Sequence, residues 1–414
     1  GRIHFETIEE YANYARSVVR AERGDVELPR KVSFFGVSNP DDKATEMSTR
    51  FLIKRLHELL AGKRESSDGA VWQLDAFLKE QATKDKLGHL LGGDERPALL
   101  FTASHGMEFP KGHPLQLRHQ GALLCQDWPG PRRFREHQIP ERFYFSGDDL
   151  AAQKNLHGMI AVFFACYGAG TPKLDQFARQ AGKSSREEIA PHNFVARLPS
   201  KLLSHPSGGA LAVIGHVERA WGYSFLSADS TAHTNSFEDT LRELMSSQRI
   251  GWATESLNLR YADKATELSG VLEEESYAES AKMNPYELAG LWTANNDARG
   301  YVIIGDPAVK APLKGSSPVR AAERPAEVNT AAVAAPAHGA VVNFSAGTTI
   351  PAAPEETVQT DQKARLDSAL AKLCESAAAR IERNAAALAS GENVDLPKLF
   401  LLIELVKELR KGSA

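Results

Sequence analysis

Short apolar runs recur through the first three quarters of the chain, and longer helix-like stretches separate them. The runs cover 32–37, 98–103, 159–165, 210–215 and 301–304. Runs of four to eight apolar residues are typical of strands that are buried on both faces of a parallel sheet. The intervening segments are long enough to hold crossover helices. The pattern predicts an α/β fold with a mostly parallel sheet flanked by helices.

Helical signals predict two helices near the start of the chain. Thr7 and Glu10 form a capping-box pattern, in which each side chain can satisfy the other residue's backbone N–H, and the helix that they open should end near Gly24. A second helix should start at Asp42, because apolar residues follow it at helical spacing. These residues are Met47, Phe51, Leu52, Leu56, Leu59 and Leu60.

The composition changes after residue 310. Ala, Pro, Gly, Ser and Thr dominate 311–354, and such a segment cannot bury enough apolar surface to offset the entropy cost of ordering it. Two amphipathic stretches follow and predict a C-terminal helical hairpin, which docks on the main domain or binds another protein. The expected organisation is an N-terminal helical segment (1–31), a main domain (32–310), an Ala/Pro-rich linker (311–360) and the hairpin (361–414).

Composition and charge narrow the class of partner. The chain has 49 Lys and Arg against 53 Asp and Glu, so its formal net charge of -4 gives no bulk attraction to nucleic acid or to an anionic membrane. No run of about 18 apolar residues predicts a membrane span. The cysteines Cys125, Cys166 and Cys374 are too scattered for a disulfide framework, which favours a cytoplasmic setting. We expect a protein or peptide partner.

Two of the expected strands lead directly into residues that can do chemistry. One is followed by His105 and Gly106, and another by Cys166. Active groups collect beyond the carboxyl ends of parallel strands, so a thiol nucleophile and an imidazole that moves protons are expected at one edge of the sheet. The alternative is that Cys166 is a small buried apolar residue and His105 a hydrogen-bonded polar group.

Three blocks make the region 32–309 resemble the caspase-like (clan CD) cysteine peptidases, in particular the bacterial gingipain-like and CHAT branches. The blocks are Ser104-His105-Gly106 after one strand, Ala165-Cys166 after another, and the closing Tyr301-Val302-Ile303-Ile304-Gly305-Asp306-Pro307. The order of histidine before cysteine also fits. The Gln-Ala-Cys signature of animal caspases is absent, because Phe164 takes the Gln position. Their preference for aspartate is therefore not transferred to this chain.

The resemblance implies a caspase-like sheet and a thiol protease that needs no cofactor and no metal. Cys166 would attack the scissile carbonyl, and His105 would donate a proton to the departing amine. The backbone N–H groups of Gly106 and Cys166 would stabilise the oxyanion. The superfamily implies no dependable carboxylate partner for the histidine, so no residue is assigned to orient His105.

Acidic and aromatic residues are candidates for the substrate pocket. Asp148 and, preferably, Asp149 would pair with an Arg or Lys side chain before the cut, or would instead cap a helix that begins near Leu150. Trp221 and Tyr223 follow another expected strand, where they would wall the pocket by stacking or pack in the core.

Two alternatives compete for the histidines. His216 also follows an apolar run and a glycine, so it could take the role given to His105. A zinc site would draw on His105, His113, His119 and Cys125, but their spacing matches no common zinc pattern. We therefore expect no metal.

These features together predict a hydrolase, a cysteine endopeptidase that cuts protein substrates after Arg or Lys. It could be latent until an activating or regulatory protein, a ligand or cleavage in the linker releases it. The competing hypothesis is a catalytically silent scaffold or regulatory module that binds partners through the C-terminal helices.

Overall fold

The computed structural model describes residues 2–63, 65, 69–134, 138–151, 155–177, 186–227, 231–277 and 283–315. The chain divides into two compact units, one formed by 1–272 with 283–321 and the other by 273–282 with 322–414. The first unit holds the sheet and the candidate site. The expected hairpin, and all of the expected linker beyond residue 315, lie outside the described residues.

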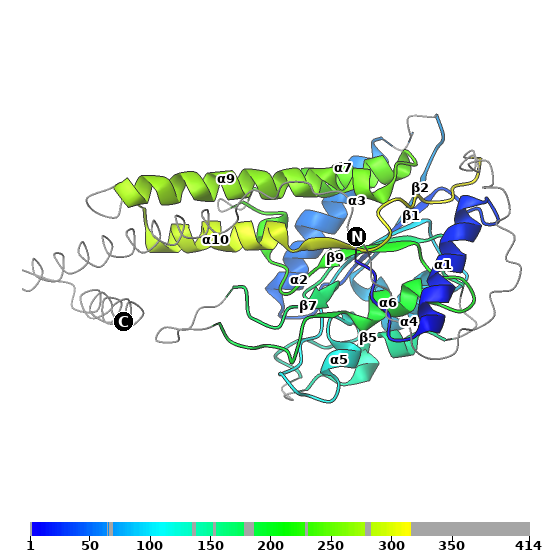
Figure 1. Ribbon diagram of the computed structural model, residues 1–414, viewed down its shortest axis with the longest axis horizontal. Coiled ribbons are helices and arrows are strands. Elements are labelled where there is room, and N and C mark those ends of the chain that lie inside the picture. The colour runs from blue at the N-terminus through cyan, green and yellow to red at the C-terminus, as the bar shows by residue number, and fades with distance from the viewer. Residues whose placement is uncertain are drawn as a thin grey trace, which may run out of the picture. The chain divides into compact units, whose positions relative to one another are not determined.

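The first unit is built around a six-stranded sheet in the order β10-β9-β6-β3-β1-β2 (Figure 1). Neighbouring strands are parallel, except that β10 runs antiparallel to β9. Helices cover both faces, so the predicted α/β class with a mostly parallel sheet is confirmed. The strands are β1 Lys31–Gly36, β2 Gln73–Leu78, β3 Leu99–Ala103, β6 Ile160–Phe164, β9 Ala212–His216 and β10 Tyr301–Gly305.

The five expected apolar runs correspond to β1, β3, β6, β9 and β10. Strand β2 was not predicted, because it lies at an edge of the sheet and its six residues are exposed or half-buried. Its sequence therefore mixes Gln73 and Asp75 with apolar residues and lacks a continuous apolar run. At the other edge, Arg2 bonds to β10, donating its N–H to the Ile303 carbonyl at 2.8 Å and accepting from the Gly305 N–H at 2.8 Å.

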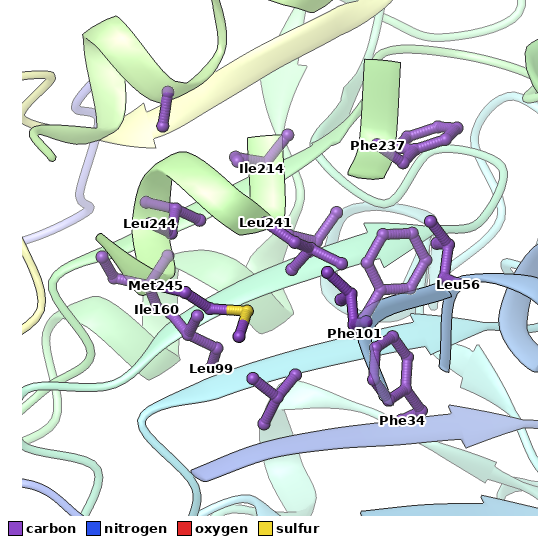
Figure 2. Packing of buried hydrophobic residues seen from close by; sticks show 14 of the residues in the cluster. Phe34, Leu56, Leu99, Phe101, Ile160, Ile214, Phe237, Leu241, Leu244 and Met245 are labelled. Carbon is purple, nitrogen blue, oxygen red and sulfur yellow. The ribbon is translucent and has the colours of Figure 1, made fainter. Parts of the chain in front are cut away.

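Helices pack on the sheet through two apolar cores. The core on one face joins the strands to α3 and α7, where Phe101 meets Phe237 edge-to-face at a ring-centroid distance of 5.6 Å (Figure 2). The core on the other face joins them to α1, α4 and α6. The helices are α1 Ile8–Glu22, α2 Lys43–Met47, α3 Arg55–Ala61, α4 Lys84–Leu90, α5 Gln116–His119, α6 Arg197–Leu203, α7 Asn235–Met245, α8 Ile250–Ala253, α9 Glu255–Tyr277 and α10 Pro285–Arg299.

Both helices expected near the start of the chain are present, with one difference in each. The expected capping box of the first is only half formed, because the Glu10 Oε2 accepts the Glu6 N–H at 2.9 Å and not that of Thr7. Thr7 caps α1 by accepting the Glu10 N–H at 3.2 Å. Asp42 caps α2 by accepting the Ala44 N–H at 3.1 Å. The stretch after Asp42 is not one α-helix, because a π-helical segment, η1 Ser48–Lys54, separates α2 from α3. Rare π-helical turns of this kind often occur beside functional sites.

Short elements complete the described part of the first unit. Two small antiparallel ladders pair β4 Leu123–Leu124 with β5 Tyr144–Phe145 and β7 Gly170–Thr171 with β8 Phe194–Val195. The 3₁₀ turns are η2 Lys79–Gln81, η3 Glu141–Phe143, η4 Gly147–Asp149 and η5 Gly222–Ser224. Among the helices that the structure describes, none has both the length and the apolar character to cross a bilayer.

Candidate active site

The carboxyl ends of β3 and β6 bring His105 and Cys166 to one level of the sheet. Ala103 and Phe164 are paired in neighbouring parallel strands, and each functional residue follows its strand end by two positions. The Ser104 N–H donates to the Phe164 carbonyl at 3.2 Å and so extends this register toward the site. The two side chains line one pocket of about 350 Å³, which we call the Cys166 pocket.

Asp42 holds the imidazole of His105. The His105 Nε2 lies 2.6 Å from the Asp42 Oδ2, and the Thr45 hydroxyl donates to the same oxygen at 3.1 Å. Burial opposes ionisation of the Asp42 carboxyl, but hydrogen bonds from His105, Thr45 and the Ala44 N–H outweigh it and keep its pKa below the ordinary value. An ionised carboxylate only accepts hydrogen bonds. Nε2 therefore carries the proton of the neutral ring, and Nδ1 keeps a free lone pair.

Asp42 is a site residue for which the sequence analysis assigned no catalytic role. It was expected only to start a helix, and it does so while it also holds His105. Its signal was a polar residue a few positions beyond the first core strand. Sequence alone could not select it, because the contact joins two loops separated by two helix-strand units and depends on the path of both.

Gly106 lets two backbone segments touch beside Cys166. A Cβ atom at this position would lie 1.7 Å from the Cys166 carbonyl oxygen and 3.0 Å from the Cys166 nitrogen. Only a residue without a side chain allows so close an approach. Within the described residues, the backbone N–H groups of Gly106 and Cys166 donate to no protein acceptor. Two free donors therefore lie close to the thiol.

The thiol of Cys166 is protonated at neutral pH in this arrangement. Burial raises its pKa to about 11, Glu108 adds to the rise, and the nearby Arg219 charge acts in the opposite direction. The sulfur lies 3.7 Å from the Ala220 oxygen. Proton transfer to a base is therefore needed before the sulfur can act as a strong nucleophile.

The residue after Cys166 has an unusual backbone conformation. Tyr167 has a φ of +58°, in the left-handed region that an aromatic residue rarely adopts. Its ring is buried, and its hydroxyl donates to the Glu108 Oε1 at 2.8 Å. The Tyr167 N–H also donates to the Glu218 carbonyl at 2.6 Å. These bonds connect the loop after β6, which contains Cys166 and Tyr167, to the loops that follow β3 and β9.

A second pocket of about 460 Å³ lies on the other side of His105, and we call it the His105 pocket. His105 and Gly106 line it, whereas Cys166 is not among its described lining residues. Its walls are mostly apolar and include Met107, Phe109 and Trp128. The exposed Glu108 is the acidic residue among the described lining residues.

Asp148 and Asp149 lie in η4, away from both pockets. Asp148 pairs with Arg118 and lies 3.0 Å from the His119 Nε2. Asp149 closes a capping box with Ser146 and forms an ion pair with Lys84 at 2.7 Å. Their carboxylates serve a capped turn and local ion pairs, so they provide no negative charge at the thiol.

Trp221 lies on the loop after β9 but outside the described lining of both pockets, whereas its neighbours Ala220 and Gly222 line the Cys166 pocket. Its ring is exposed and packs against Phe177 at a centroid distance of 5.8 Å. Its backbone N–H donates to the Asp297 Oδ1 at 2.8 Å. Next to the thiol, this loop places the Ala220 backbone carbonyl and the small residues Ala220 and Gly222.

The alternative histidine sites are engaged elsewhere. His216 is fully buried, and its ring nitrogens lie 2.9 Å from the Asp297 carbonyl and 3.2 Å from the Glu218 carbonyl. His119 contacts the Tyr144 hydroxyl and Asp148. Among the described residues, the group that could converge on a metal is His89, Asp94 and Glu95, which contains none of the four residues weighed for zinc.

Comparisons with known proteins find similarity among solved structures and none among family models or curated proteins. No protein-family model matches the chain, and no curated protein matches it. A solved structure described as "Structure of Protease" is similar with a TM-score of 0.38 and 12% identity, over 75% of this chain and 55% of that chain. This chain thus spans about half the length of that protein.

Proposed function

We propose that the protein is a cysteine endopeptidase of the caspase-like type, in which Cys166 is the nucleophile and His105 transfers the proton. One observation carries the proposal. The two residues leave neighbouring parallel strands at the same level and line one pocket, while Asp42 fixes the imidazole from behind. A nucleophile, a proton carrier and an orienting carboxylate form the arrangement that thiol hydrolases need.

The first half of the reaction acylates the enzyme. The thiol proton of Cys166 moves to His105 Nδ1, and the sulfur forms a bond to the carbonyl carbon of the substrate. The free N–H groups of Gly106 and Cys166 donate to the oxyanion that develops. The C–N bond then breaks, and the proton on His105 goes to the leaving amine.

The second half releases the product. A water molecule loses a proton to His105 and attacks the thioester carbonyl, and the C–S bond breaks to give a free carboxylic acid. The proton on His105 returns to the Cys166 sulfur, so the resting site is regenerated. Asp42 stabilises the imidazolium that exists in both halves.

The decisive experiment measures peptide cleavage by the full chain and by Cys166→Ala. We expect the variant to lose cleavage and to keep the melting temperature of the wild type, because the thiol makes only one weak hydrogen bond. Cys125→Ala is the matched control, since that cysteine is fully buried and outside both pockets. A Cys166→Ala protein that retains more than a few per cent of the wild-type rate would remove Cys166 from the mechanism.

The position of the Cys166 thiol supports latency as part of this proposal. Within the described residues its hydrogen-bond partner is the Ala220 carbonyl and not the imidazole of His105. A partner protein or cleavage in the 311–360 segment is then a reasonable activating event. Intact-mass measurement after prolonged incubation tests the second route, and a chain that becomes active without any loss of mass would contradict it.

A further inference from the structure

We infer that the proposed peptidase prefers an uncharged, apolar residue before the cut, of the size of Leu, Met or Phe, and that the Cys166 pocket holds its side chain. This inference rests on the proposed function. It replaces the preference for Arg or Lys expected from Asp148 and Asp149, whose carboxylates are paired elsewhere. The chemistry of the pocket lining carries it.

The reaction decides which pocket receives which half of the substrate. The acyl half stays bonded to the Cys166 sulfur, and the amine half takes its proton from His105 and departs. The side chain next to the attacked carbonyl therefore lies in the pocket that Cys166 lines, and the residue after the cut lies toward the His105 pocket. The Cys166 pocket thus selects the residue before the cut.

The interior of the Cys166 pocket is mostly apolar, with Thr45, Ser48 and Ser104 as the hydroxyl-bearing residues of its lining. Phe164 ends strand β6 two positions before Cys166, and both residues line the pocket. The Phe164 ring packs edge-to-face on the buried Phe225 at a centroid distance of 5.4 Å. Met47 and Ala44 come from the α2 side. Since a dry apolar cavity of about 150 Å³ already accommodates benzene, a pocket of about 350 Å³ has room for an aromatic side chain.

No counter-charge awaits a basic side chain in this pocket. Within the described lining there is no Asp, Glu, Lys or Arg. Three carboxylates lie near the thiol or the lining: Asp42, which is engaged by His105 and Thr45, and Glu108 and Asp297, which act on the thiol. Glu108 lines the His105 pocket and accepts from the Tyr167 hydroxyl, and the fully buried Asp297 is paired with Arg260 at 3.1 Å. An Arg or Lys side chain would therefore be desolvated without a partner, which is strongly unfavourable.

A peptide series that varies only the residue before the cut tests the inference. With full-length protein, we expect kcat/KM for Leu, Met or Phe to exceed that for Arg or Lys by at least about tenfold, as pocket chemistry of this kind commonly gives. Met47→Glu, which adds a carboxylate at the half-buried wall of the pocket, should shift the preference toward Lys and Arg. Met47→Gln has the same shape without the charge and should keep the apolar preference.

The outcomes separate this inference from the proposed function. Cleavage that depends on Cys166 but occurs mainly after Arg or Lys in the wild type would overturn the apolar preference and leave the peptidase assignment intact. An equal shift in Met47→Glu and Met47→Gln would also overturn it, because the effect would then follow shape and not charge. The absence of Cys166-dependent cleavage for every peptide would overturn both.

Discussion

The carboxyl ends of β3 and β9 look alike in sequence but serve different purposes. Each core strand leads to a histidine near a glycine, and the two strands flank β6 on either side. The His105 side chain is 39% exposed and bonds to a carboxylate that leaves one ring nitrogen free. The His216 side chain is fully buried, and both of its nitrogens face backbone carbonyls. A histidine can transfer protons only if one nitrogen remains available, so the partners decide the role.

The largest difference should appear between two single variants, His105→Ala and His216→Ala, in cleavage rate and in stability. We expect His105→Ala to lower the cleavage rate roughly 100- to 10,000-fold, as loss of a general acid-base group does, and to leave the melting temperature unchanged. His216→Ala should instead destabilise the fold by about 1 to 3 kcal/mol, because buried partners lose their hydrogen bonds. Peptide cleavage and thermal unfolding, measured on both variants, check this. Matching losses of activity without unfolding in both variants would erase the distinction.

A smaller effect should follow from Asp42→Asn. Asn caps helices as well as Asp, so α2 should remain stable. The Asn amide carries no charge, so it no longer stabilises the His105 imidazolium. We therefore expect kcat to fall about 100-fold, the lower end of the range for loss of acid-base catalysis. A melting curve adds a second readout, since α2 keeps its cap and the melting temperature should stay that of the wild type. An unchanged rate would show that Asp42 only caps the helix.

The smallest expected effect concerns the protonation state of the Cys166 thiol in the resting protein. With the pKa of Cys166 raised to about 11, the thiolate fraction, and with it alkylation by iodoacetamide, should rise about tenfold per pH unit from pH 7 to 10. Peptide mapping by mass spectrometry follows Cys166 separately from the fully buried Cys125, which should stay unmodified until the protein unfolds. Alkylation that levels off near pH 8 would mean that the Ala220 carbonyl and burial do not hold the proton.

The sequence predicted the buried part of the fold well. The runs that became β1, β3, β6, β9 and β10 are apolar because helices cover both faces of the sheet, and that requirement leaves a local signal. The edge strand β2 left no such apolar signal in the sequence. The segment after Asp42 was expected to be one helix, because its apolar spacing does not record the change of hydrogen-bond pattern in η1 Ser48–Lys54.

The candidate site was only partly predictable. His105, Gly106 and Cys166 could be found because each follows a strand end in the same parallel sheet, and neighbouring strand ends must lie close together. The role of Asp42 and the partners of Asp148 and Asp149 depend on how loops fold back across the sheet edge. Such contacts leave no periodic pattern in the sequence, so charged residues in loops could not be assigned to the correct neighbours.

The bond between Arg2 and β10 affects how copies of the protein meet. An edge strand offers unpaired N–H and C=O groups that another chain can use to extend the sheet. Arg2 already occupies the Ile303 carbonyl and the Gly305 N–H. A second copy could extend the sheet along β10 only after displacing this segment. Pairing of residue 2 with β10 therefore disfavours edge-to-edge aggregation at this strand.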